Sequence, residues 1–325
     1  MADGPNRVLL DRSKAAADAQ KLLGPTLSLV EEVVDYGTHL IVRLMSTSDP
    51  GIFREMVVGA LLKHVVLMLD AIHILCDQGA TRVAMLQARS LLEASLYCEW
   101  MLKENQEERA RAYYVWNLRQ ERHWARRGIL GTPEQESIQA HLESTLGPGA
   151  PSPAADAETN AKSLERIHSI DEYLSKEPLR QVNERFEAAR AKAKEQRRDW
   201  EVERWYQVLG KRSLREIAKE LDQMGTYVVF YDLWSRLTHA NSYREHFTIL
   251  ESERLAILPI RSLREANTLL QVALALTFGT YRCVLNFLRP GEIEAYSRRY
   301  QSEWRQRYLT IPRVDEQVEI VDSID

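Results

Sequence analysis

The chain has 325 residues, of which 45% are hydrophobic, so it is long enough to bury one large core or two smaller ones. Its 43 Lys and Arg residues are slightly outnumbered by 47 Asp and Glu residues, and the formal net charge is −4. This balance excludes a protein that coats nucleic acid by bulk positive charge, so any contact with nucleic acid would have to be local.

Helical periodicity dominates the chain. Apolar residues recur in steps of three and four from residue 10 to residue 305, and alternating β-branched runs are almost absent, which predicts an all-α fold. Before residue 147 we expect a break at Gly24-Pro25, because proline interrupts helices, and a new start at Pro50. The expected helices in this part cover residues 11–23, 26–44, 50–79, 81–102, 107–127 and 132–146.

A linker rich in Pro and Gly at residues 147–153 is followed by a charged stretch. Residues 159–199 are dense in Lys, Arg, Glu and Ala, which predicts a solvated and weakly packed helical arm that breaks near Pro178. The core pattern resumes at Trp200. The expected helices after it cover residues 202–209, 213–222, 226–246, 263–288 and 290–308.

These elements predict a helical bundle core of five to seven long helices with a charged helical arm. Residues 1–146 and 200–310 would complete the same core, residues 147–199 would form the linker and arm, and residues 311–325 would be a mobile tail.

The location and the cofactors are predicted from what the sequence lacks. The amino-terminal residues do not follow the pattern of a secretory signal, and charged side chains interrupt the longest apolar run, Val57 to Ile74. The three cysteines, Cys76, Cys98 and Cys283, lie in apolar stretches without metal-ligand spacing. We therefore expect a cytoplasmic protein with no membrane partner, no metal and no cofactor.

A stripe of polar side chains lies within the expected helix 226–246. Steps of four, four, three and four residues place these side chains on one helix face, and they are Tyr231, Ser235, His239, Ser242 and His246. Such a stripe must face water, line a pocket or be paired inside the core, since an unpaired buried polar group costs about 1 to 3 kcal/mol. Ser235, His239 and Asp232 also match a nucleophile, base and orienting acid, although one helix rarely aims all three correctly.

Arg89 and Glu93 lie four residues apart on an otherwise apolar helix face. Two interpretations are open. They form a structural ion pair that ties two helices together, or they converge with Tyr231, Ser235 and His239 into one polar pocket.

Two segments carry a family resemblance. The stretch Leu86-Gln-Ala-Arg-Ser-Leu-Leu-Glu-Ala-Ser-Leu-Tyr-Cys-Glu-Trp100, together with residues 205–220 and the Tyr231-x-x-x-Ser-x-x-x-His239 helix, resembles a widespread family of bacterial all-helical proteins of unknown function. No activity follows from that family.

The all-α architecture is also similar to the helical RNases of the HEPN superfamily. In those enzymes an arginine precedes a histidine with four to six residues between them. Here Arg236 precedes His239 with two residues between them, and Arg119 precedes His123 with three, so this chain departs from the HEPN spacing. The resemblance implies metal-independent RNA cleavage, in which His239 would remove the 2′-hydroxyl proton while Arg236 stabilises the developing charge.

A second set of residues could contact nucleic acid directly. Trp116, Arg119, His123 and Arg126 share one face of the expected helix 107–127, where aromatic rings could stack on bases and arginines could hold phosphates. The alternative is a core helix whose aromatic rings pack inward while its arginines stay solvated.

Two classes of function follow, and whether the protein is an enzyme is left open. The first is a bacterial effector or toxin of stress or antiviral defence that cleaves or binds RNA, with His239 assisted by Arg89, Glu93, Tyr231, Ser235 and Arg236. The second is a non-catalytic helical module that binds a partner protein, a second copy of itself or a small ligand in the same polar pocket.

Overall fold

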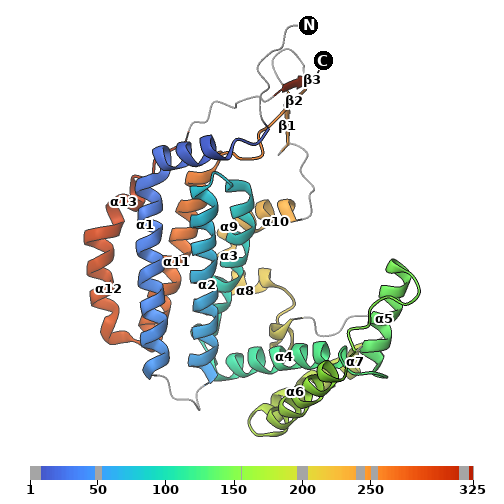
Figure 1. The fold of residues 1–325 in the computed structure, drawn as a ribbon. Coiled ribbons are helices and arrows are strands. Elements are labelled where there is room, and N and C mark those ends of the chain that lie inside the picture. The colour runs from blue at the N-terminus through green and yellow to red at the C-terminus, as the bar shows by residue number, and fades with distance from the viewer. Residues whose placement is uncertain are drawn as a thin grey trace. The chain divides into compact units, whose positions relative to one another are not determined.

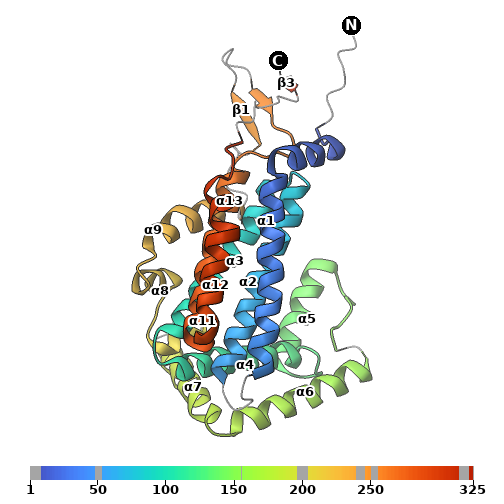
Figure 2. The same cartoon turned by 90° about the vertical axis from the view of Figure 1, so that its left-hand side faces the viewer.

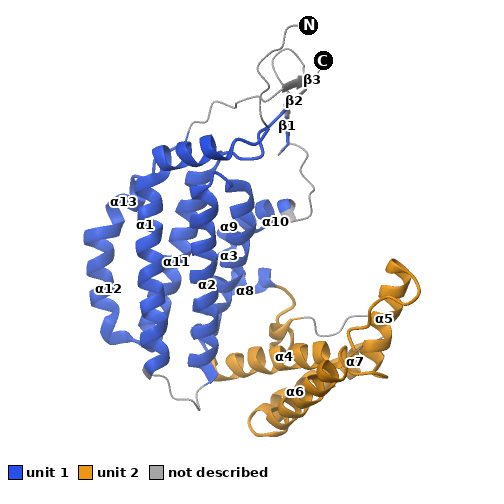
Figure 3. Cartoon of the chain, viewed as in Figure 1, with its two compact units in different colours: residues 1–104, 214–325 blue, residues 105–213 orange. Residues whose placement is uncertain are grey.

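The computed structural model describes residues 9–47, 53–154, 156–195, 204–238, 246–249, 255–314 and 322–324. The chain divides into two compact units (Figure 3). Unit 1 comprises residues 1–104 and 214–325, and unit 2 comprises residues 105–213.

Four long helices form the centre of unit 1. They are α1 (Arg12–Thr47), α2 (Phe53–Asp77), α3 (Thr81–Lys103) and α11 (Ala266–Leu288). Helix α2 packs against both α1 and α3, and α11 packs against α2 and α3, so the four run side by side (Figures 1 and 2). Their facing sides are apolar and fully buried, which confirms the predicted all-α bundle.

Shorter elements complete unit 1. Between α3 and α11 lie α8 (Leu214–Glu220), α9 (Met224–Thr226), the π-helical turn η2 (Tyr227–Tyr231) and α10 (Asp232–Thr238). After α11 the chain forms η4 (Pro290–Glu292), α12 (Ile293–Arg299), the π-helical turn η5 (Tyr300–Trp304) and α13 (Arg305–Leu309).

A small antiparallel sheet was not expected. Its three strands, in the order β1 (Phe247–Ile249), β2 (Leu255–Ile257) and β3 (Asp322–Ile324), pair Phe247 with Ile257 and Leu255 with Ile324. His246 lies in the turn before β1, so the expected helix does not reach this residue. Strand β3 belongs to the tail that we expected to be mobile.

The expected break at Gly24-Pro25 is wrong. Helix α1 is continuous over 36 residues and contains Pro25. Pro25 has no N–H for the carbonyl one turn earlier, and the first turns of α1 run at an angle to the rest of the helix (Figure 1). Leu23 and Leu27 are buried on either side of the proline, so packing holds both parts in one helix.

A glycine allows close contact between α1, α2 and α11. The Tyr281 hydroxyl donates a hydrogen bond to the carbonyl of Val33 at 3.0 Å, one turn before Gly37. A Cβ atom at Gly37 would lie 2.0 Å from the Tyr281 hydroxyl oxygen and 2.6 Å from Cγ2 of Val66. Only glycine fits at this position.

Helices α2 and α11 are long and apolar enough to cross a membrane. In the most apolar 18-residue segment of each helix, 50% of the segment in α2 and 61% of the segment in α11 is buried inside the protein. The central helix of a soluble bundle meets the same criteria of length and hydropathy, so the cytoplasmic location stays a prediction.

Unit 2 is built around α4 (Gln106–Arg126). Helix α4 packs against α6 (Ala157–Ser175), α7 (Leu179–Glu195) and η1 (Trp205–Leu209), and it also contacts α5 (Pro133–Leu146). Helix α5 begins as expected, because the Thr132 side chain accepts a hydrogen bond from the backbone N–H of Gln135 at 3.3 Å.

The division between the units differs from the expected boundary. It falls at Glu104 rather than at the linker, so α4 and α5 belong to unit 2 and not to the bundle of unit 1. The charged arm breaks near Pro178 as expected, and most of its side chains are exposed, but both of its helices also bury an apolar face. Ile170 and Leu174 of α6 are buried, as are Val182 and Phe186 of α7. Each pair has a spacing of four residues, which gives an otherwise charged helix a narrow apolar face.

Candidate functional site

Three of the predicted catalytic residues lie together in unit 1. Nη2 of Arg89, on α3, donates a hydrogen bond to the Tyr231 hydroxyl at 3.0 Å, and the guanidinium carbon lies 4.8 Å from the centre of the Tyr231 ring. Nε of Arg89 lies 3.3 Å from Oε1 of Glu93. The Arg89 and Glu93 side chains are 23% and 28% exposed, so a ligand in solvent could still reach them.

Further polar residues surround this group, although their spacing in the sequence did not link them to it. Nε2 of His64, on α2, lies 2.8 Å from the Ser90 hydroxyl, and burial lowers the pKa of His64 although the charge of Glu93 opposes the shift. Tyr227 stacks on Tyr231 with ring centres 4.6 Å apart. We call His64, Arg89, Ser90, Glu93, Tyr227 and Tyr231 the Arg89 cluster. Tyr227 lies four residues before Tyr231 and could have been found as an extension of the polar stripe.

The aromatic side of the Arg89 cluster is formed by a π-helical turn. Residues 227–231 form η2, a wider turn of the kind that often occurs at functional sites. Burial raises the pKa of Tyr227 to about 12, with a further contribution from Tyr231. Tyr227 is therefore a neutral hydrogen-bonding group at physiological pH.

Of the other predicted catalytic residues, the structure describes the side chain of Ser235 alone. The Ser235 hydroxyl donates to the carbonyl of Tyr231 at 2.6 Å, so its single donor is used within the helix. Residue His239 and the side chain of Arg236 lie outside the described part of the structure.

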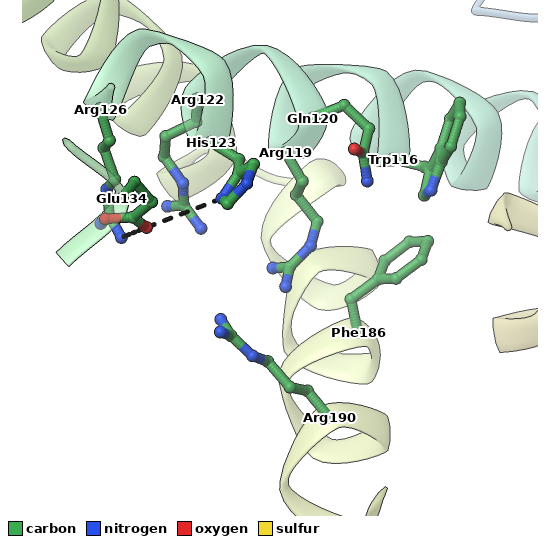
Figure 4. Close-up of a pocket in the computed structure, with 9 residues that line it drawn as sticks. All are labelled: Trp116, Arg119, Gln120, Arg122, His123, Arg126, Glu134, Phe186 and Arg190. Atoms are coloured by element: carbon green, nitrogen blue, oxygen red, sulfur yellow. Dashed lines mark hydrogen bonds and ion pairs between the residues drawn. The ribbon is translucent and has the colours of Figure 1, made fainter. Parts of the chain in front are cut away.

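In unit 2 the predicted nucleic-acid-binding residues line one pocket (Figure 4). Trp116, Arg119, His123 and Arg126 reach into it from α4, and Phe186 and Arg190 of α7 face them across it. Its volume is about 70 Å³. We call it the arginine pocket, and its lining residues are Trp116, Arg119, Gln120, Arg122, His123, Arg126, Glu134, Phe186 and Arg190.

Carboxylates partly neutralise the arginine pocket. Nη1 of Arg119 donates to Oε1 of Glu187 at 2.6 Å, and Nη1 of Arg122 donates to Oδ1 of Asp171 at 2.8 Å. Arg126 lies 3.2 Å from Glu134. Burial alone would raise the pKa of Glu187, but the hydrogen bond and charge of Arg119, with the charges of Arg190 and Arg122, hold that pKa below its ordinary value.

The charge balance of the arginine pocket still favours an anion. Four arginines line it, against Glu134 in the lining and Glu187 and Asp171 just outside. The side chains of Glu187 and Asp171 are 49% and 48% exposed, so both can turn into water if a phosphate takes their place. The pocket is therefore locally cationic in a chain whose net charge is negative.

The two contributors from α7 were missed because residues 185–198 resembled an ordinary solvated charge run. Phe186 and Arg190 lie four residues apart on α7, and this spacing was the available signal. Trp124, which is 61% exposed on α4, was also not assigned, and the Arg127 guanidinium lies 3.8 Å from its ring centre.

Within the described ranges, no group of three His, Cys, Asp or Glu side chains is arranged to hold a metal ion. The candidate sites therefore consist of guanidinium, carboxylate, imidazole and aromatic groups.

No curated protein and no solved structure matches the chain. The sequence profile of a family of unknown function, DUF5677, matches residues 55–253. This range is more than half of the chain and includes the Arg89 cluster and the arginine pocket, and the predicted resemblance to an uncharacterised family is confirmed. The chain belongs to the family of unknown function DUF5677.

Proposed function

We propose that this protein binds single-stranded RNA through the arginine pocket of unit 2. The observation that carries the proposal is the convergence of four arginines, one imidazole and two aromatic rings on a single small pocket. Guanidinium groups bind phosphate oxygens through paired hydrogen bonds, and aromatic rings stack on unpaired bases.

The size of the pocket suits one phosphate group of an RNA strand. At about 70 Å³ it is too small for a whole nucleotide, so the sugar and base would lie outside it. Trp124 lies one helical turn beyond the pocket residue Gln120 and offers an exposed ring for the next base. Phosphate would compete with Glu187 and Asp171 for the same arginines, which favours moderate affinity and a marked dependence on salt.

The test is titration of a fluorescently labelled 12-nucleotide RNA with wild type and an Arg119→Gln/Arg190→Gln double variant. The matched control is Arg166→Gln/Arg180→Gln, which removes the same charge from exposed ion pairs of unit 2. We expect the pocket variant to bind at least about 10-fold more weakly, with a smaller salt dependence, and the control to stay within about 2-fold. Equal losses in both variants, with unchanged unfolding temperatures, would show that only net charge matters.

A single-stranded DNA of the same sequence tests the choice of RNA. Equal affinity for both strands would reduce the proposal to backbone binding without a preference for the sugar. No binding of wild type to either strand at 50 mM salt would overturn it.

The second candidate function is metal-independent RNA cleavage at the Arg89 cluster. The specific observation is that Arg89 donates to Tyr231 beside Glu93, with the neutral imidazole of His64 bonded to the adjacent Ser90. An imidazole could remove the 2′-hydroxyl proton while the guanidinium stabilises the charge on phosphorus. This chemistry would suit a cytoplasmic bacterial effector of stress or antiviral defence.

The cleavage test uses total RNA in excess EDTA with wild type, His64→Ala, His239→Ala and Arg89→Lys. We expect wild type to cleave and Arg89→Lys to be at least about 100-fold slower, because lysine lacks the paired donors of arginine. The two histidine variants identify the base. Intact RNA with wild type would remove this candidate and leave the RNA-binding proposal untouched. If Arg89→Lys lowers only the unfolding temperature, the cluster is structural.

A further inference from the structure

A second cavity, separate from the Arg89 cluster, lies in unit 1 between α3, η2 and α11. Its volume is about 630 Å³, within the range of about 300 to 1,000 Å³ that is typical of small-molecule sites. Polar and apolar side chains both line it, so it suits a ligand that has both apolar and hydrogen-bonding parts.

One wall of this cavity holds a carboxyl group, and one of its two oxygens is available to accept a hydrogen bond from a ligand. Oε2 of Glu99, on α3, accepts a hydrogen bond from Nε2 of Gln223 at 2.5 Å. Oε1 lies beside Gly279 of α11, which has no side chain to cover it, and no described residue donates a hydrogen bond to Oε1. Burial raises the pKa of Glu99 to about 7, although Gln223 and Arg282 oppose the shift.

Three aromatic residues line other parts of the cavity. Phe230 of η2, Phe287 of α11 and Tyr308 of α13 all line the cavity, and Phe287 is 49% exposed. Rings placed around a cavity favour a planar aromatic ligand, because stacking adds to the gain from apolar burial.

A positively charged side chain also lines the cavity. Arg282 of α11 is exposed, and no described carboxylate forms an ion pair with it. Its positive charge partly offsets the rise that burial causes in the pKa of Glu99 and of Cys283, so the guanidinium lies near both groups. An exposed arginine of this kind, with its paired donors available, is suited to phosphate.

We propose that this cavity binds a guanine nucleoside monophosphate, with the N–H edge of the base on Glu99 and Gln223, the ring against Phe230 or Phe287, and the phosphate on Arg282. Guanine presents two neighbouring N–H donors, which match a carboxylate that has an unused acceptor. Adenine presents an acceptor next to a donor and fits an ionised carboxylate less well. The proposal does not depend on RNA binding, because its residues belong to unit 1.

Binding through this edge requires ionised Glu99. Near neutral pH part of the population carries a proton there, so binding should release it, and affinity should rise between pH 6 and pH 8. The other titratable or charged groups around Glu99 are Cys98 on the same helix, Arg282 and Cys283 on α11, and Tyr308 on α13. The pKa of Cys283 is raised to about 12 and Arg282 stays charged, so neither changes state in this range.

Calorimetric titration of the full chain tests the proposal with GMP, guanosine and AMP as probes. We expect GMP to bind at least about 10-fold more tightly than AMP. Arg282→Gln should weaken GMP binding about 10-fold and leave guanosine unchanged. Glu99→Gln should weaken both guanine probes and abolish the proton release measured with guanosine, which lacks the ionisable phosphate of GMP. Proton release is measured by comparing heats in two buffers of different ionisation enthalpy.

Three variants serve as controls. Ala275→Trp fills the cavity from an exposed lining position and should abolish GMP binding without lowering the unfolding temperature. Arg298→Gln removes an exposed charge of unit 1, and Arg119→Gln alters the arginine pocket, and both should bind GMP like wild type. Absence of GMP binding up to millimolar concentration, equal binding of AMP and GMP, or unchanged binding in Ala275→Trp would overturn the proposal. Weaker GMP binding in Arg119→Gln would instead place the nucleotide in unit 2 and also overturn it.

Discussion

The two units are stabilised by different balances of forces. Unit 1 buries large side chains completely, including Trp100, Trp304 and Tyr281, and burial raises the pKa of groups such as Glu99. Unit 2 also buries Trp205 and Phe186, but ion pairs such as that between Arg119 and Glu187 join its neighbouring helices and lower carboxylate pKa values. Apolar burial therefore dominates the stability of unit 1, whereas unit 2 should respond more to salt and acid.

The largest expected effect comes from deleting a buried ring of unit 1. Trp304 is fully buried, with its ring centre 5.4 Å from that of Tyr36. Trp304→Ala should lower the free energy of unfolding by about 3 to 5 kcal/mol, because it leaves a large cavity. The same substitution at Trp124, which is 61% exposed in unit 2, should change it by less than about 0.5 kcal/mol.

Urea unfolding followed by circular dichroism gives both values, and hydrogen exchange assigns the loss to unit 1. Similar losses for the two tryptophans would contradict the contrast between the units.

The next effect tests close packing within unit 1. Gly37→Ala should destabilise the protein by about 1 to 3 kcal/mol, because the new methyl group would overlap the Tyr281 hydroxyl and Val66. Gly225→Ala, in α9, would meet no neighbouring atom within 4 Å and should be neutral or slightly stabilising. Differential scanning calorimetry compares the two, and equal melting temperatures would show that α1 and α11 do not approach as described.

A smaller effect is the pH dependence of stability in unit 1, which has the opposite sign to that expected in unit 2. Since the pKa of Glu99 is raised to about 7, native protein binds its proton more tightly than unfolded protein does. The stability due to Glu99 is then complete below its ordinary pKa of 4.5 and is lost as pH rises through about 7. Glu99→Gln should remove a decline on the order of 2 kcal/mol between pH 4.5 and 7.5.

Wild type must be compared with Glu99→Gln, because His64 titrates in a neighbouring pH range and changes the free energy of unfolding in the opposite direction. Its pKa is lowered, so its protonation in the unfolded chain destabilises unit 1 as pH falls. Parallel pH profiles of the two proteins would show that Glu99 is not buried as described.

The smallest effect belongs to unit 2. The pKa of Glu187 is lowered, so its contribution is present above the ordinary value of 4.5 and is lost as pH falls below it. The loss should be less than about 1 kcal/mol, because the side chain is half exposed. Hydrogen exchange of α7 at pH 6 and pH 4 measures it, and Glu187→Gln should abolish the difference. An unchanged difference in that variant would assign the acid sensitivity to other carboxylates.

The fold could be predicted where the chain's own periodicity decides it. Steps of three and four residues predicted α2, α3, α4 and α11 to within a few residues, because the apolar face of a helix is written into its own sequence. The break at Pro25 was wrongly predicted, since burial on both sides outweighs the missing hydrogen bond. Strand β3 was missed because its partner lies about 65 residues earlier in the chain.

The candidate sites also contain a part that the sequence determines and a part that only tertiary structure determines. The sequence by itself determined that Arg89 and Glu93 share a helix face, and that Trp116, Arg119, His123 and Arg126 share another, because neighbours at helical spacing follow from backbone geometry. Tertiary structure alone decided that Tyr231 would reach Arg89 and that Phe186 and Arg190 would close the arginine pocket.

The cavity that contains Glu99 was not visible in the sequence at all. Gln223 follows Glu99 by 124 residues, and Arg282 lies on yet another helix. No local spacing links groups so far apart along the chain. They meet because each helix buries its own apolar face, and the polar residues beside those faces are carried into one cavity by that packing.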